Sequence, residues 1–228
     1  MRKPSRSPSE ESVVVVLSTA LITARNSRRR ADQYLAGLLQ WFRRFPDQEF
    51  FWVDNTIASA DGLDSRFLLL RAWLPEGHAV FFDDNGLGIE NKGAGVISQL
   101  KKLESKGVFR RHRFVLFHEP RQKVLVWATI QSLISRPSSA FRVETVWKSP
   151  YLLQGFSFTP NFYTGTFMID SDVLLDFLNS TSAGELHSSM ESIEQSLYSF
   201  FARKEIPFKS IFVLWVRRTR IGGKKEYR

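Results

Sequence analysis

Apolar residues recur along the chain in two patterns, and the first predicts buried strands. Short runs rich in β-branched and aromatic residues are bounded by polar residues or turn formers. Four consecutive valines, Val13 to Val16, leave no polar face, which is typical of a strand covered on both sides within a parallel sheet. The runs predict strands at 13–19, 50–53, 80–82, 113–117, 164–169 and 211–216.

Between these runs, apolar residues repeat at three- and four-residue spacing, as they do on one face of a helix. The spacing predicts helices at 27–45, 95–106 and 188–204, and a further helix capped by Ser171. Segment 122–135 stays open between helix and strand, because its spacing fits a helix while its composition favours strand. The alternation of strands and helices predicts one α/β domain with a mainly parallel central sheet flanked by helices.

The composition is that of a globular protein, with 43% hydrophobic, 14% aromatic and 24% charged residues among 228. Cysteine is absent, which excludes a disulfide scaffold, a Cys-ligated zinc site and a thiol nucleophile. The longest apolar run near the start is far shorter than the roughly 20 residues that span a bilayer. The basic first residues, followed by Glu10 and Glu11, make a poor signal peptide, so a soluble cytoplasmic protein is expected.

The positive charge is concentrated at the end of the chain. The net charge is +9, from 32 basic and 23 acidic residues, and segment 217–228 alone contributes six basic residues and one acidic residue. We expect a basic, disordered tail at 1–11, a folded domain at 12–216 and a basic tail at 217–228. The C-terminal tail is either solvated or in peripheral contact with an anionic membrane. No nucleic-acid-binding motif accompanies it, so nucleic acid is not expected, although a basic-tailed nucleic-acid-binding or interaction protein without catalysis remains the alternative.

Four of the predicted strands end in polar residues or are directly followed by them, at the edge where ligands bind in sheets of this kind. These polar residues are Ser18-Thr19, Asp54-Asn55, Asp83-Asp84-Asn85 and His118-Glu119. After the third strand, Asn85 to Gly95 is a Gly-rich stretch that enters a helix. Its backbone N–H groups and Lys92 are suited to a phosphate or diphosphate, and the alternative is a surface turn with a Gly-rich cap.

Three acidic segments are further candidates. Glu119 is suited to a divalent metal and Arg121 to phosphate oxygens, or the two form a salt-bridged strand end. The pair Asp170 and Asp172 has metal-ligand spacing, but a helix cap explains it better. Glu191 and Glu194 lie three residues apart near a helix start, where a carboxylate serves as general base or is simply exposed.

The order of these motifs resembles that of small GT-A-type glycosyltransferases, which transfer sugars from nucleotide sugars in the synthesis of surface or viral glycans. The resemblance covers most of residues 12–216 and rests on the first strand with Ser18-Thr19 followed by "WVDNT" (52–56), "DNGLGIENKGAG" (84–95), "FVLFHEPRQ" (114–122), "FYTGTFMID" (162–170) and "ESIEQSLYSFFARKEIPF" (191–208). The departure from the family is His118-Glu-Pro-Arg121, which stands where most members carry Asp-x-Asp.

The resemblance implies a hexosyl- or deoxyhexosyltransferase that uses a nucleotide-diphosphate sugar and a glycan, glycolipid, glycoprotein or lipid-linked acceptor, as in polysaccharide biosynthesis. Glu194, with Glu191 beside it, is the implied base. Glu119 is the implied ligand of Mn²⁺ or Mg²⁺, unless Arg121 replaces the metal. The implied donor-binding residues are Ser18, Thr19, Asp54, Asn55, Asn85, Asn91, Lys92, Gly93, Arg121, Thr164 and Gly165.

Overall fold

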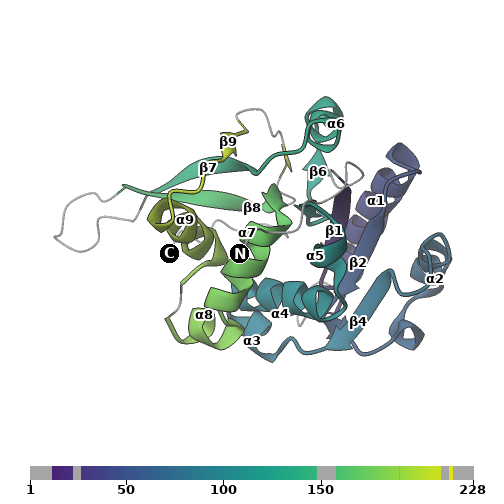
Figure 1. Cartoon of the computed structure of the whole chain (residues 1–228). Helices are drawn as coiled ribbons and strands as arrows, with labels where there is room; N and C mark the ends of the chain where they lie inside the picture. The colour runs from purple at the N-terminus through teal and green to yellow at the C-terminus, as the bar shows by residue number, and fades with distance from the viewer. Residues whose placement is uncertain (1–11, 23–26, 148–157, 190, 212–215, 218–228) are drawn as a thin grey trace.

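An eight-stranded sheet forms the centre of the molecule in the computed structural model, which describes residues 12–22, 27–147, 158–189, 191–211 and 216–217 (Figure 1). The strand order is β3-β4-β2-β1-β5-β8-β7-β9. The strands are β1 (Val13–Thr19), β2 (Phe50–Asp54), β3 (Thr56–Ile57), β4 (Ala79–Asp83), β5 (Phe114–His118), β7 (Ala140–Trp147), β8 (Phe158–Asp170) and β9 (Lys209–Ser210). A separate antiparallel pair joins β6 (Lys123–Val124) to β10 (Val216–Arg217).

The strands β4, β2, β1 and β5 are parallel to one another, and β8 is antiparallel to both β5 and β7. The predicted fold class, an α/β domain with a mainly parallel central sheet flanked by helices, is confirmed, with the parallel part confined largely to these four central strands. The chain thus runs through β8 in the direction opposite to β5, and residues in the first half of β8 return to the edge where β5 ends.

Helices cover both faces of the sheet (Figure 1). Every residue of β1 is buried: Val14 and Val16 pack on one face, whereas Val13, Val15 and Leu17 pack on the other, as the unbroken valine run predicts. The first face is covered by α4 (Lys92–Ser105), α5 (Val108–Arg111), α7 (Ser171–Ser180), α8 (Ala183–Ser189) and α9 (Ile193–Arg203), and the second by α1 (Ser27–Arg44), α2 (Ser65–Arg71) and α6 (Trp127–Ser135).

Three expected elements are divided differently in the structure. The helix predicted at 188–204 is two helices, α8 and α9, and Ser192 caps the second by accepting a hydrogen bond from the Gln195 N–H. The Gly-rich stretch is α3 (Gly86–Glu90) followed by α4, so α4 begins before the predicted Gly95. Segment 122–135 contains β6 and then α6.

Asp170 caps α7 by accepting a hydrogen bond from the Asp172 N–H, which confirms the cap interpretation of the pair and places the cap one residue before Ser171. Of the strand predicted at 211–216, residues 212–215 lie outside the described residues, as do 1–11 and 218–228 of the two predicted tails. Within the described part of the chain, no helix is both long and apolar enough to cross a membrane.

Candidate functional site

The candidate site lies at the edge of the sheet where the parallel strands end. Here β1 ends at Thr19, β2 at Asp54 and β5 at His118. Because β8 is antiparallel to β5 and Thr166 pairs with His118, the preceding residues of β8 reach the same edge. The backbone N–H of Glu119 donates to the carbonyl of Gly165 at 2.9 Å, which joins the segment after β5 to β8.

Asp54 lies at this edge, and both of its carboxylate oxygens accept hydrogen bonds from within the protein. Its side chain is completely buried. Oδ2 accepts from the Thr19 hydroxyl at 2.6 Å and the Leu21 N–H at 2.9 Å, and Oδ1 accepts from the N–H and hydroxyl of Thr56 at 2.7 and 2.6 Å. Asp54 therefore fixes the chain after β1 and the turn after β2.

A second set of hydrogen bonds ties the same strand ends to α4. The Ser18 hydroxyl donates to Oε1 of Gln99, and Nε2 of Gln99 donates to the Thr19 carbonyl at 2.8 Å and to Oδ1 of Asn55 at 3.0 Å. Nδ2 of Asn55 donates to Oδ1 of Asn85 at 3.0 Å. We call Ser18, Thr19, Asp54, Asn55 and Gln99 the polar floor; all five are buried.

Four of the predicted donor-binding residues belong to the polar floor. They are therefore buried, and they bond to neighbouring side chains and to the backbone. Gln99 was missed by sequence reasoning. A signal for it exists, because Gln99 lies between Ile97 and Leu100 on the buried face of an amphipathic helix, where an unpaired polar side chain would be costly.

The start of α4 is fixed against the start of α9. Asn91 caps α4 through Oδ1, which accepts from the Gly93 N–H at 2.9 Å, and its Nδ2 donates to the carbonyls of Leu186 and Glu191 at 2.9 and 3.1 Å. A Cβ atom on Gly93 would lie 2.9 Å from the backbone nitrogen of Ile193, so only glycine allows this approach. The predicted residues Asn91 and Gly93 thus hold the two helix starts together.

Charged side chains gather around Glu119 just after β5. Oε1 of Glu119 accepts from the Tyr34 hydroxyl at 3.1 Å and from Nε of Arg121, and Oε2 accepts from Nζ of Lys92 and Nε2 of Gln122 at 2.7 and 2.8 Å. We call these five residues the charged cluster. Tyr34 and Gln122 were missed by sequence reasoning: Tyr34 belongs to the apolar stripe of α1 and lies 85 positions away from Glu119.

Electrostatics keep Glu119 ionised. Burial acts to raise the pKa of its carboxyl group, but the nearby charges of Lys92 and Arg121 and their hydrogen bonds hold that pKa well below its usual range. A divalent cation does not fit this carboxylate as arranged, because both oxygens are engaged by donors and two of those donors are positively charged. Among the described residues, no group of three or more His, Asp and Glu side chains is arranged to hold a metal ion.

The predicted base lies beside the predicted sugar-lining residues. The Thr164 hydroxyl donates to Oε1 of Glu194 at 2.8 Å, and Glu194 is half-buried in the first turn of α9. A Cβ on Gly165 would lie 2.4 Å from Nε2 of Gln122, so glycine is needed there for Gln122 to reach Glu119. Glu194, rather than Glu191, contacts the β8 segment.

The predicted site residues therefore form two hydrogen-bonded groups. One is the polar floor, and the other is the charged cluster, which is linked through the Glu119–Gly165 backbone bond to the segment that holds Thr164 and Glu194. Asn85 bonds to the polar floor, whereas Lys92 and Arg121 belong to the charged cluster.

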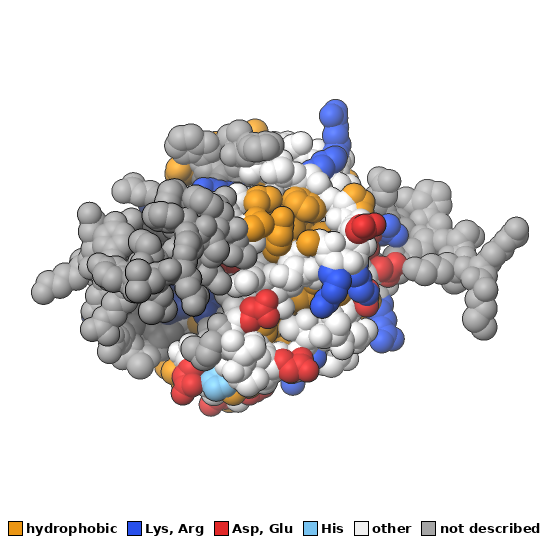
Figure 2. Space-filling model, turned by 90° about the vertical axis from the view of Figure 1, so that its left-hand side faces the viewer, with side chains coloured by type: hydrophobic (Ala, Val, Ile, Leu, Met, Phe, Trp, Pro, Cys, Tyr) orange, Lys and Arg blue, Asp and Glu red, His pale blue; other side chains and the backbone are white. Residues whose placement is uncertain are grey.

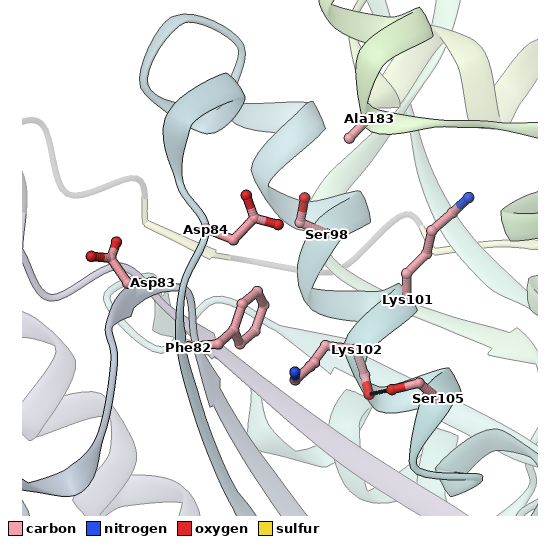
Figure 3. A pocket seen from close by; sticks show the side chains of 8 residues that line it. All are labelled: Phe82, Asp83, Asp84, Ser98, Lys101, Lys102, Ser105 and Ala183. Carbon is pink, nitrogen blue, oxygen red and sulfur yellow. Dashed lines mark hydrogen bonds between the residues drawn. The ribbon is translucent and has the colours of Figure 1, made fainter.

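A hollow of about 480 Å³ lies elsewhere, between the end of β4 and the middle of α4 (Figure 3). No residue of the polar floor or the charged cluster lines it, and it contains both acidic and basic side chains. Its lining residues are Phe82, Asp83, Asp84, Ser98, Lys101, Lys102, Ser105 and Ala183.

Comparisons with known proteins support the fold. No protein-family model and no curated protein sequence matches the chain. A solved structure from Desulfovibrio desulfuricans G20, provisionally described as a nucleotide-diphospho-sugar transferase, matches over 89% of this chain and 80% of its own, with a TM-score of 0.51 and 11% identity.

Two further solved structures, each 11% identical, match with lower TM-scores. They are a 4-diphosphocytidyl-2C-methyl-D-erythritol synthase (TM-score 0.46; 82% of this chain and 87% of that one) and a glycosyltransferase involved in glycosylation of the major capsid of PBCV-1 (TM-score 0.39; 88% and 81%). The fold comparison rests on the first of the three structures: this chain has the fold of a protein described as a nucleotide-sugar transferase.

Proposed function

We propose that the protein is a glycosyltransferase that moves a sugar from a nucleotide-diphosphate sugar to a hydroxyl group of an acceptor. The observation that carries the proposal is the arrangement at the sheet edge: Lys92 and Arg121 bond to Glu119, whose backbone N–H bonds to Gly165, and the neighbouring Thr164 bonds to Glu194. Cations suit the diphosphate of a donor, and the carboxylate of Glu194 suits proton removal from an acceptor hydroxyl.

In the proposed reaction, the acceptor oxygen attacks the anomeric carbon of the donor sugar while the bond from that carbon to the diphosphate oxygen breaks. The nucleoside diphosphate leaves with the bonding electrons, and Lys92 and Arg121 stabilise its developing charge. The acceptor proton passes to Glu194. Because Thr164 engages Oε1 of Glu194, Oε2 is the oxygen that we assign to the proton.

The polar floor supports this site from below in the proposal. Its buried hydrogen bonds fix the ends of β1 and β2, over which the nucleoside of the donor would lie. Ser18, Thr19, Asp54 and Asn55 then act mainly by positioning the backbone around the donor, whereas Lys92, Arg121, Thr164 and Gly165 lie closer to the diphosphate and sugar.

The acceptor class and the pathway are further parts of the proposal. A glycan or a lipid-linked acceptor of polysaccharide biosynthesis is consistent with a basic segment at 217–228 that contacts an anionic membrane. The alternative, a basic-tailed protein that binds nucleic acid without catalysis, predicts an affinity that falls steeply with salt and disappears when residues 217–228 are deleted. On the described part of the face in Figure 2, basic and acidic side chains are interspersed.

Calorimetric titration with UDP, GDP, dTDP and CMP, each with EDTA and with manganese, tests the proposal. We expect one nucleotide to bind with micromolar affinity and its sugar conjugate to be consumed when acceptor is present. Failure of all four to bind under both conditions would refute the glycosyltransferase function. Binding that disappears in EDTA would restore Glu119 as a metal ligand.

A further inference from the structure

The charged cluster contains a carboxylate, Glu119, although a site that binds an anion needs only the positively charged groups. Lys92 and Arg121 supply two positive charges, and Glu119 between them neutralises one. Glu119 is buried, and it remains ionised because both cations lower the pKa of its carboxyl group. In the proposed reaction this carboxylate would lie where the phosphates of the donor also need the two cations.

The two cations differ in how firmly they are held. The side chain of Lys92 is 59% exposed, whereas that of Arg121 is only 16% exposed. Lys92 is the first residue of α4, so its backbone is fixed by the Asn91 cap, while its long side chain is largely exposed along its way to Glu119. The Lys92 ammonium can therefore change partner by side-chain rotation alone.

Glu119 itself is held from two sides by neutral donors. The Tyr34 hydroxyl reaches it from α1 and the Gln122 amide from the segment after β5. Burial and the neighbouring charge of Glu119 raise the pKa of Tyr34, so this hydroxyl stays protonated and remains a donor. When Lys92 leaves, Tyr34, Gln122 and Arg121 still donate hydrogen bonds to the carboxylate. Lys92 alone can therefore change partner without leaving Glu119 unpaired.

We propose that Glu119 is an internal counter-ion beside the diphosphate subsite, and that an incoming diphosphate replaces it as the partner of Lys92. The inference rests on the proposed function and deepens it, because it assigns the diphosphate to a subsite made of two side-chain cations. Arg121 stays paired with Glu119, and Lys92 moves to the phosphate. Glu119 thereby lowers the affinity of the site for free phosphates, which favours release of the nucleoside diphosphate product.

Inorganic pyrophosphate is the probe, because it carries the diphosphate without a nucleoside or sugar. Isothermal titration in EDTA compares the full-length protein with its Glu119→Gln variant, which keeps the side-chain shape and removes the charge. Removing a negative charge next to both cations should tighten pyrophosphate binding about tenfold or more. Unchanged or weaker binding by a folded Glu119→Gln variant would overturn the inference.

A second set of variants changes Lys92 in the same titration, and it does not require a substitution at a buried position. Lys92→Met should weaken pyrophosphate binding about tenfold, and in the double variant it should remove most of the gain given by Glu119→Gln. Lys92→Arg should restore much of the affinity. Lys101→Met, which removes a lysine on the same helix outside the charged cluster, is the matched control and should bind as the unaltered protein does.

The outcomes separate this inference from the proposed function. Tighter pyrophosphate binding by Glu119→Gln together with no binding of any nucleotide would retain the subsite and refute the transferase. A second outcome is that a nucleotide binds and that Glu119→Gln tightens pyrophosphate binding as much in the Lys92→Met protein as in the unaltered protein. This outcome would retain the transferase and refute the exchange of Lys92. Thermal unfolding of each variant verifies that a loss of binding is not a loss of fold; if Glu119→Gln does not fold, the Lys92→Met result decides, and unchanged binding overturns the inference.

Discussion

His118 makes the stability of the folded protein dependent on pH. Its imidazole is completely buried, packs against Trp41 with ring centroids 4.9 Å apart, and has Nδ1 2.6 Å from the Thr166 hydroxyl. Burial in this environment lowers the pKa of His118 to about 3, despite the opposing charge of Glu119. The unfolded chain restores the ordinary value of about 6.5.

The sign of the effect follows from which state binds the proton. Between pH 6.5 and pH 3 the unfolded chain protonates His118 and the folded protein does not, so lowering the pH favours unfolding. Each pH unit in this window costs about 1.4 kcal/mol, so His118 alone costs about 2 kcal/mol on going from pH 7 to pH 5. Burial also lowers the pKa of His112, more than Glu49 raises it, which adds a loss of the same sign.

Urea denaturation at intervals between pH 7 and pH 5 measures the effect. The variant His118→Gln keeps an amide that reaches Thr166 and cannot titrate, so it should lose about 2 kcal/mol less than the unaltered protein over this range. Phe117→Leu, a neighbouring buried substitution, should lower stability equally at every pH. An identical pH dependence in His118→Gln and the unaltered protein would refute the assignment of the proton to His118.

Three further changes have defined outcomes. Glu194→Gln should reduce kcat by about 100-fold or more and leave the Kd for the donor nucleotide nearly unchanged, because the amide keeps the shape of the side chain but cannot accept the proton; a normal kcat measured with saturating donor would exclude Glu194 as the base. Asp54→Ala should lower the free energy of unfolding by about 3 kcal/mol or more, since four donors lose their acceptor; a loss below about 1 kcal/mol in urea titration would contradict this role. Gly93→Ala should destabilise the contact between α4 and α9 by about 1 to 3 kcal/mol, because the new Cβ meets the Ile193 backbone, and an unchanged Tm would show that the helices can separate freely.

Local patterns account for most of the fold. The valine run predicts β1 and the apolar stripe predicts α1, each from its own residues. A strand buried on both faces is apolar without interruption, whereas a helix buried on one face is apolar at every third or fourth residue. The break between α8 and α9 was missed because the apolar positions favour one continuous helix. Its signal was present in Ser192, which, three residues before Gln195, has the spacing of a helix cap.

The candidate site was predictable only in part, because its contacts join distant segments. Polarity at strand ends identified Asp54 and Glu119 as notable, but not what surrounds them. Tyr34 meets Glu119 across 85 positions and Thr164 meets Glu194 across 30, and only the strand order brings these pairs together. That order also decides that Asp54 is enclosed by donors, which no local pattern shows.

Helix α4 is hydrogen-bonded to the rest of the site at several points along its length. At its start, Asn91 is bonded to the segment before α9 and Lys92 to Glu119, whereas two turns later Gln99 is bonded to the ends of β1 and β2. An axial shift of this helix would break all of these bonds together. The spacing between the polar floor and the charged cluster is therefore set by the pitch of one helix, and a one-residue insertion between Lys92 and Gln99 would rotate one set of contacts away from the other by about 100°.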